Sequence, residues 1–113
     1  MTPDELRETC LSLPQAIETF PFGEETSVFK TSGNDKLFAV TALDGQPLSV
    51  TLKCDPEESL AMQQEFAQIT PGYHINKKHW ITVVLDDQLP TELVEQLIRE
   101  SHSLVRQRVP RAR

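Results

Sequence analysis

The sequence lacks the cysteine motifs of metal or redox sites, the glycines of a phosphate-binding loop and the long apolar run of a membrane span. Its two cysteines, Cys10 and Cys54, lie 44 residues apart and form no metal or redox motif, so we expect buried thiols in a reducing compartment. Four glycines leave no room for a phosphate-binding loop. No apolar run approaches the roughly 20 residues of a membrane span, and the acidic residues 1–5 are unlike a signal peptide. We therefore expect a cytoplasmic protein that does not enter a membrane.

The charge of the chain is negative and unevenly distributed. With 113 residues, of which 38% are hydrophobic, the composition is typical of one soluble domain over residues 1–113. A net charge of −6 argues against a protein that coats nucleic acid nonspecifically. From Arg99 onward the chain carries +4, whereas residues 1–98 carry −10. We interpret residues 108–113 as a frayed basic tail, with phosphate contact as the alternative.

Three helix starts share one design, in which a proline at the first helical position is followed by glutamate. Residues 2–5 and 55–58 place a capping Thr or Asp before the proline, and they predict helices over residues 3–13 and 56–68. Residues 89–92 are a weaker copy that begins the closing helix, because Leu89 cannot cap. The expected inner residues of the second helix are Leu60, Met62 and Phe66.

Alternation of apolar and polar residues predicts four strands, separated by Gly-containing turns in the first half of the chain. Residues 16–23 read as a linker, whose Phe20 and Phe22 we expect to tuck over the sheet because exposed rings would be wasteful. The resulting order α-β-β-β-α-β-α predicts an α+β fold, an antiparallel β-sheet with helices packed on one face. The predicted strands cover residues 26–31, 36–43, 48–53 and 79–85.

The stretch at residues 71–85 combines the chemistry that recognition requires. It holds the only Trp, the only Tyr, two of the three His and the only Lys-Lys pair. Amide and imidazole groups, ammonium groups and an aromatic surface suit contact with phosphate and bases, and Trp80 falls on the less apolar face of its strand. The alternative is that Trp80 packs under the sheet and both lysines point into water. The candidate contact residues are Lys53, Tyr73, His74, Asn76, Lys77, Lys78, His79 and Trp80.

Motifs for catalysis or metal binding are missing. His74 and His79 are the nearest approach to a metal site, but their odd spacing puts them on opposite faces of a continuous strand, and no third ligand is evident. We therefore expect neither a metal nor a cofactor. We interpret His102 as a packing or solvent-edge residue rather than a base. No enzymatic activity is expected, because a base at His74 or His79 would lack a nucleophile and an orienting acid.

Five separated segments carry a family resemblance across nearly the whole chain. They are FPFGE at 20–24, KLFA at 36–39, LKCDPE at 52–57, PGYHINKKHW at 71–80 and LIRES at 97–101. In this order they resemble the MmcQ/YjbR family of small bacterial proteins. The resemblance implies a CyaY-like fold, and members of the family are commonly labelled DNA-binding on the idea that paired β-wings grip a duplex.

The resemblance places the two wings at residues 33–36 and 44–46. These turns carry two Asp against a single Lys, which is a poor phosphate contact. The family's Asn-Lys-x-His-Trp segment is intact at residues 76–80 and is the better candidate surface.

These observations favour a small non-enzymatic cytoplasmic binding domain that contacts double-stranded DNA through the loop at residues 73–80, with Lys53 and the basic tail. A protein-interaction or small-ligand module is the alternative, in which Trp80, Tyr73 and His79 line a groove beside Phe20 and Phe22. The partner would then be another protein or a small molecule. A monomer is the default expectation.

Overall fold

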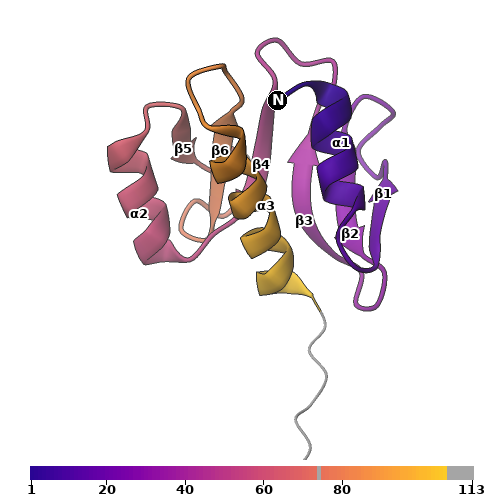
Figure 1. Ribbon diagram of the computed structural model, residues 1–113. Helices are drawn as coiled ribbons and strands as arrows, with labels where there is room; N and C mark the ends of the chain where they lie inside the picture. Colours follow the sequence, from indigo (N-terminus) through magenta and orange to yellow (C-terminus); the bar gives the residue numbers. More distant parts are fainter. Residues whose placement is uncertain (74, 107–113) are drawn as a thin grey trace, which may run out of the picture.

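The fold is a six-stranded antiparallel sheet with three helices (Figure 1). The computed structural model describes residues 1–73 and 75–106. The strands lie in the order β1-β2-β3-β4-β6-β5. The α+β class with an antiparallel sheet is confirmed, with six strands instead of the predicted four. In chain order the elements are α1 (Pro3–Leu11), β1 (Ala16–Thr19), β2 (Ser27–Thr31), β3 (Lys36–Thr41), β4 (Ser49–Lys53), α2 (Pro56–Glu65), β5 (Ile69–Pro71), β6 (Trp80–Val84) and α3 (Thr91–Val105).

The sequence did not predict β1 and β5, the two edge strands of the sheet. β1 has four residues and lies in the segment expected to be a linker, and β5 has three residues after the second helix. Strands this short show no readable alternation, and they exist because β1 pairs with β2 and β5 pairs with β6. The predicted helices were also too long at their C-terminal ends, since α1 ends at Leu11 and α2 at Glu65.

The helix starts follow the predicted capping pattern. Thr2 Oγ1 accepts from the Glu5 N–H at 3.1 Å while the Glu5 carboxylate accepts from the Thr2 N–H at 2.9 Å, and these bonds lower the pKa of Glu5. Asp55 caps α2 by accepting from the Glu57 and Glu58 N–H groups. α3 begins after Pro90 without a side-chain cap, in agreement with the weaker start read from the sequence.

One face of the sheet, here called the inner face, is covered by α1 and α3 (Figure 1). Alternate residues of the central strands are fully buried there, including Leu52 of β4 and Ile81 of β6. Leu6 and Cys10 of α1 and Ile98 of α3 pack against them. The inner face therefore holds the hydrophobic core, as the strand alternation predicted.

α2 lies at the β5 end of the sheet and packs less completely (Figure 1). Met62 and Phe66 contact the core as predicted, but Leu60 is 62% exposed, so its predicted inner position is wrong. The helix packs mainly on the two strands β5 and β6, which cover a narrow strip of its surface.

A β-bulge in β3 directs two consecutive residues to the inner face. Phe29 pairs with Ala39 and Lys30 pairs with Leu37, so Phe38 is the extra residue between the two pairs. Phe38 and Ala39 are both fully buried. β3 pairs with β4 at two positions, Ala39 with Leu52 and Val40 with Thr51.

Ser101 of α3 completes the hydrogen bonding where β3 and β4 separate. Its hydroxyl accepts from the Lys53 N–H at 2.8 Å and donates to the Phe38 carbonyl at 2.6 Å, which gives a partner to two backbone groups that lie beyond the β3–β4 ladder pairs. The adjacent His102 is buried, lies 2.8 Å from the Pro14 carbonyl and stands edge-on to the Phe38 ring. His102 is therefore a packing residue, as interpreted from the sequence.

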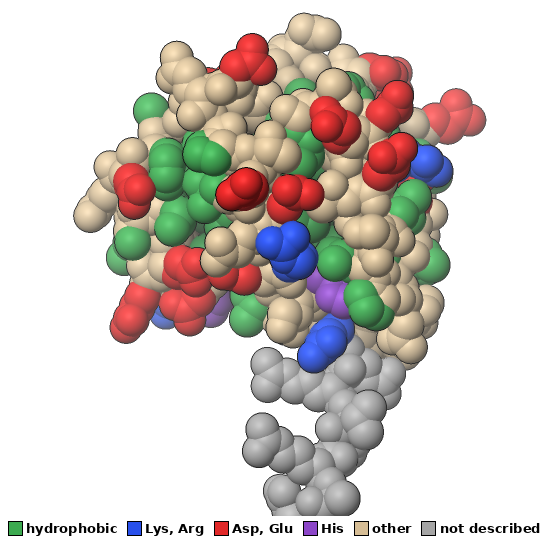
Figure 2. All heavy atoms as spheres, in the orientation of Figure 1, with side chains coloured by type: hydrophobic (Ala, Val, Ile, Leu, Met, Phe, Trp, Pro, Cys, Tyr) green, Lys and Arg blue, Asp and Glu red, His purple; other side chains and the backbone are tan. Residues whose placement is uncertain are grey.

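The described helices leave the other face of the sheet, the outer face, uncovered (Figure 1). The helices contain nine Asp and Glu against two Arg, whereas the strands contain one Glu against three Lys. Figure 2 shows the helix side of the molecule, where acidic side chains outnumber basic ones. Two of the three strand lysines, Lys30 and Lys53, lie on the outer face by register. Among the helices and strands, the negative charge is thus concentrated in the helices, and the loops add seven more acids, including Glu24 and Glu25 near Phe22.

Candidate functional site

The outer face is hollowed into a groove of about 540 Å³, here called the outer groove. Its floor is formed by β3 and β4 and includes Val40 and Thr51. One wall is Phe22, from the loop before β2, and the other is Tyr73 with Ile75, from the loop before β6. None of the lining residues that the structure describes is charged. Ligand pockets of roughly 300–1,000 Å³ with mostly apolar walls and a few polar groups are typical of small-molecule sites.

The two walls of the outer groove present exposed aromatic rings. Phe22 is 68% exposed and Tyr73 is 69% exposed, and β3 and β4 lie between the strands that carry their loops. Phe20, in the same loop as Phe22, is 49% exposed. The prediction that both phenylalanines are tucked away is wrong, because no described helix lies over this face to bury them. Exposed rings at the rim of a hollow are a feature of binding surfaces.

The loop between β5 and β6 is held closed around Gly72. Its N–H donates to the Trp80 carbonyl at 2.9 Å, and its carbonyl accepts from Lys77 Nζ at 3.0 Å. A Cβ at this position would lie 2.6 Å from Ile75 Cγ2 and 2.8 Å from Trp80 Cβ, so a side chain does not fit without rearrangement. Gly72 therefore sets the path that brings Tyr73 and Ile75 to the groove wall.

Asn76 continues this internal bonding of the loop. Its side-chain oxygen accepts from the Lys78 N–H at 2.9 Å and from the His79 N–H at 3.3 Å, which is an Asx turn. All four residues 76–79 are exposed, but Asn76 and Lys77 also support the loop itself. Their contact with a partner stays a prediction.

A chain of hydroxyl groups joins the loop to the groove floor. The Tyr73 N–H donates to Thr82 Oγ1 at 3.1 Å, and Thr82 Oγ1 lies 3.0 Å from Thr51 Oγ1 across the β6–β4 pair. Thr51 lines the floor of the outer groove. The wall and the floor are therefore coupled through side chains that alternation places on the outer face.

The remaining predicted site residues are spread over this region. Trp80 is half-buried on the outer face and pairs with Lys53, but neither residue lines the outer groove. His79 also lies outside the lining, and His74 is outside the described residues. Of the residues predicted to line a groove, Tyr73 and Phe22 do so. Trp80, His79 and Phe20 are not among the lining residues. Sequence reasoning missed the floor, although the outward residues of β3 and β4 could have been read from the strand alternation.

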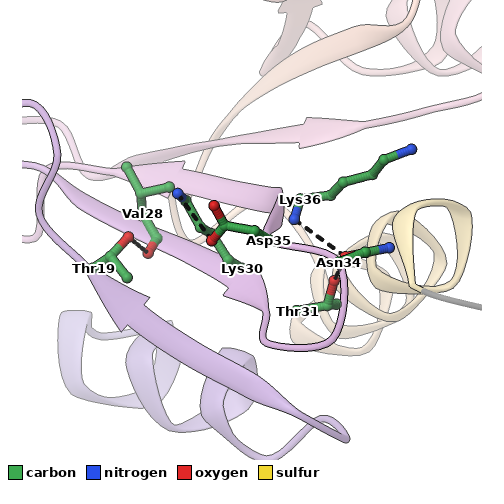
Figure 3. Close-up of polar contacts among 7 residues, drawn as sticks. All are labelled: Thr19, Val28, Lys30, Thr31, Asn34, Asp35 and Lys36. Carbon is green, nitrogen blue, oxygen red and sulfur yellow. Dashed lines mark hydrogen bonds and ion pairs between the residues drawn. The ribbon is translucent and has the colours of Figure 1, made fainter.

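The turn between β2 and β3, one of the two predicted wings, is fastened to the helix layer (Figure 3). Asn34 Oδ1 accepts from the Lys36 N–H at 3.2 Å, and Asn34 Nδ2 donates to the Val105 carbonyl at the end of α3 at 2.7 Å. Lys30 Nζ lies 3.4 Å from Asp35 Oδ1 in an ion pair. This turn is docked rather than free, and the neighbouring cation of β2, Lys30, is already paired.

A second, smaller hollow of about 180 Å³ lies between the start of α2 and the last turns of α3. Glu58 and Glu100 meet there, and their hydrogen bond, followed by burial and the negative charges of Glu100 and Asp55, raises the pKa of Glu58. Burial, with smaller contributions from these carboxylates, raises the pKa of Cys54 to about 11. The carboxyl pair therefore shares a proton more readily than two separate carboxyls would.

Both cysteines are free, buried and protonated at neutral pH. Burial, with a smaller contribution from Glu18, raises the pKa of Cys10 to about 12. A thiol with a raised pKa is a poor nucleophile and a poor metal ligand. Among residues 1–73 and 75–106, no three His, Cys, Asp or Glu side chains are grouped to hold a metal ion, and no helix has the length and apolar character to cross a membrane.

Known sequences place this chain in a family. The family model described as YjbR matches residues 11–104. Uncharacterized protein YbdF of Escherichia coli O157:H7 is 42% identical over 110 residues, covering 93% of this chain and 88% of that protein. Uncharacterized protein YjbR of Escherichia coli K12 is 33% identical over 103 residues, covering 90% of this chain and 85% of that protein.

Solved structures agree with this placement. The crystal structure of Deinococcus radiodurans protein DR2400, with a DUF419 domain, is similar with a TM-score of 0.86 and 47% identity, over 92% of this chain and 78% of that one. A crystal structure of a Pseudomonas syringae protein has a TM-score of 0.81 and 27% identity, over 94% of this chain and 100% of that one. With the match to the family model over most of its length, the chain belongs to the YjbR family.

Proposed function

We propose that this protein is a non-enzymatic binding domain whose ligand enters the outer groove. The observation that carries the proposal is a groove of about 540 Å³, uncharged among its described lining residues, between two exposed aromatic rings, Phe22 and Tyr73. Rings that stay exposed contribute little hydrophobic free energy to folding, and a ligand that covers them would remove this apolar area from water. The raised pKa values of both thiols argue against a cysteine nucleophile.

Preorganisation of one wall supports the same proposal. The hydrogen bonds of Gly72 and the Asx turn of Asn76 hold the loop, and the Tyr73 N–H is tied to Thr82. A ligand that meets a fixed wall does not have to order it on binding, which favours affinity.

The test is a small-molecule screen by two-dimensional NMR on the 15N-labelled protein. Binding compounds are expected to shift amide signals of β3, β4 and the loop before β6. The double variant Phe22→Ala, Tyr73→Ala should bind these compounds about ten- to a hundredfold more weakly, because each ring contributes roughly 1 kcal/mol by stacking as well as area. Phe20→Ala is the matched control, since Phe20 shares the loop but does not line the groove. Hits that shift signals elsewhere, or that bind the double variant like the wild type, would refute the proposal.

DNA binding through the loop at residues 73–80 is the second candidate, and the distribution of charge favours it. The helices carry an excess of seven acids, whereas the strands carry an excess of two lysines, so the outer face is the less repulsive side for phosphate. Lys78 is exposed at the loop beside this face, and Lys53 lies on it. Lys77 contributes less readily, because its ammonium group is bonded to the Gly72 carbonyl.

Titration of fluorescent duplex DNA at several salt concentrations tests this candidate. If the loop contacts phosphate, the logarithm of the binding constant should fall linearly with the logarithm of the salt concentration, by about 0.9 per phosphate contact. The double variant Lys77→Ala, Lys78→Ala should bind more weakly and with a shallower salt dependence. Lys36→Ala on the docked turn is the control and should change neither. An absence of binding at low salt would eliminate duplex DNA as the partner.

The cytoplasm remains the proposed location. Two free, buried thiols support it, because an oxidising compartment favours paired cysteines. Localisation of a tagged protein by fractionation of the cell tests this point.

A further inference from the structure

We infer that the outer face binds a second copy of this chain, with the two loops that wall the outer groove in contact across a twofold axis. The inference rests on the proposed function of the outer groove as a binding surface and names the partner that covers it.

The two loops carry opposite charges. The loop before β2, residues 20–26, has two acidic residues and no basic one, and is here called the acidic loop. The loop before β6, residues 72–79, has two lysines and no acidic residue, and is here called the basic loop. The exposed charged side chains are Glu24 and Glu25 in the acidic loop and Lys77 and Lys78 in the basic loop.

The strand register places these loops at diagonally opposite corners of the outer face (Figure 1). The acidic loop leads into β2 at Ser27, which pairs with Thr41 at the end of β3. The basic loop leads into β6 at Trp80, which pairs with Lys53 at the end of β4. Because β3 and β4 lie between β2 and β6 and are antiparallel, the two loops are separated both across and along the sheet.

A second copy of the same face is complementary to this diagonal. A twofold axis that lies between two facing sheets and crosses the diagonal at a right angle brings the acidic loop of each copy to the basic loop of the other. Both contacts are then attractive. A partner of a single charge would be attracted by one loop and repelled by the other, which favours a partner that carries both charges in the same arrangement.

The same two contacts cover exposed aromatic rings. Phe22 of the acidic loop is 68% exposed and Tyr73 of the basic loop is 69% exposed. A second copy therefore removes apolar area from water at both walls of the outer groove, and this burial adds to the attraction between the charges.

The size of the face predicts a weak dimer. Six strands spaced about 4.8 Å apart, with about five residues each at about 3.3 Å per residue, form a face of roughly 400 Å². Stable interfaces bury about 800 Å² on each partner. Even with the loops added, we therefore expect dissociation constants in the micromolar to millimolar range.

Sedimentation equilibrium of the full chain, at concentrations up to about 1 mM, tests the inference. We expect a monomer–dimer equilibrium in which association weakens as salt rises, because exposed opposite charges are screened. Phe22→Ala should weaken the dimer about tenfold or more, since the ring occurs twice in a twofold interface. A chain that stays monomeric over this range would overturn the inference, while compounds that shift groove amides would still support the proposed function.

Charge reversal identifies the surface that forms the dimer. The double variant Glu24→Lys, Glu25→Lys should associate about tenfold more weakly than the wild type, because it places two positive loops together. Lys78→Glu should also weaken association, and Lys77 is left in place because it closes the basic loop. The matched control is Glu57→Lys with Glu65→Lys, an equal change of charge at exposed positions of α2 that should have no effect.

A mixture of the two loop variants is the decisive sample. In equal amounts they should form heterodimers about tenfold more tightly than the double variant forms homodimers, because each supplies a charge that the other lacks. A mixture that associates no better than the separate variants would overturn this inference and leave groove binding by small compounds intact. If neither the dimer nor any compound shifts groove amides, the proposed function fails as well.

Discussion

The inner face of the sheet is sealed by two helices, whereas the outer face of the same strands is open (Figure 1). Within β4, Leu52 is fully buried under the helix layer, while its neighbour Thr51 lines the outer groove. Adjacent residues of one strand thus lie in different environments, because successive side chains point to opposite faces of the sheet. The alternation of the strands therefore separates the residues that stabilise the fold from the residues of the proposed binding groove.

The two faces also treat their polar groups differently. On the inner face, Ser101 uses its hydroxyl both as acceptor and as donor to backbone groups. On the outer face, the hydroxyls of Thr51 and Thr82 bond to each other and keep capacity for a further partner. A saturated polar group stabilises the fold, whereas one with spare capacity can bind.

The largest expected effect is the loss of stability when an apolar side chain is truncated on the inner face, compared with the same change on the outer face. Leu52→Ala should lower the free energy of unfolding by about 3 kcal/mol, because it leaves a cavity in the core. Leu37→Ala, the matched change on the outer face, should cost about 1 kcal/mol, since Leu37 is only half-buried. Urea denaturation of both variants measures the difference. Equal losses would break the distinction between a sealed and an open face.

Ser101→Ala tests the polar closure of the inner face. The variant should lose about 2 kcal/mol, because the Lys53 N–H and the Phe38 carbonyl become buried without partners. Amide exchange of Lys53 should accelerate as well. Ser103→Ala, an exposed position in the same helix, should change the free energy of unfolding by less than about 0.5 kcal/mol. A silent Ser101→Ala would mean that β3 and β4 close without the hydroxyl.

Gly72→Ala tests the construction of the outer groove. The added Cβ meets Ile75 and Trp80, so the loop must shift, at an expected cost of about 1–2 kcal/mol. Ligands of the groove should bind the variant several times more weakly. NMR signals of inner-face residues should stay in place, and if they move with the loop, the two faces are not independent.

The smallest expected effect is a pH dependence within the helix layer. Because the folded protein raises the pKa of Glu58, it binds the proton more tightly than the unfolded chain, and the free energy of unfolding should fall as pH rises above about 4.3 and through the raised pKa. Glu58→Gln and Glu100→Gln should each flatten this fall, because either amide removes the carboxyl pair. Denaturation at a series of pH values measures it, and slopes equal to that of the wild type would exclude a shared proton.

Much of the fold could be predicted from local patterns. The caps at Thr2 and Asp55, the central strands and the helix at residues 91–105 act within a few residues, where sequence and structure correspond directly. The outward position of Trp80 also followed from alternation. The edge strands were missed because pairing partners distant in sequence create them.

The candidate site was only partly predictable. Tyr73 and Phe22 were named as groove residues, but Phe22 was expected to be less exposed, and the floor was not expected. Leu60 illustrates the same limit, since apolar periodicity cannot tell how much of a helix its neighbours cover.

The sequence by itself determined the α+β class, the helix starts and which face of each central strand is apolar, because capping and alternation are local. Only the tertiary structure decided the bulge at Phe38, the role of Ser101 between two strands, and the meeting of two loops across the outer groove. Those features join residues far apart in the chain, and their geometry depends on how strands pair and where helices leave a face open.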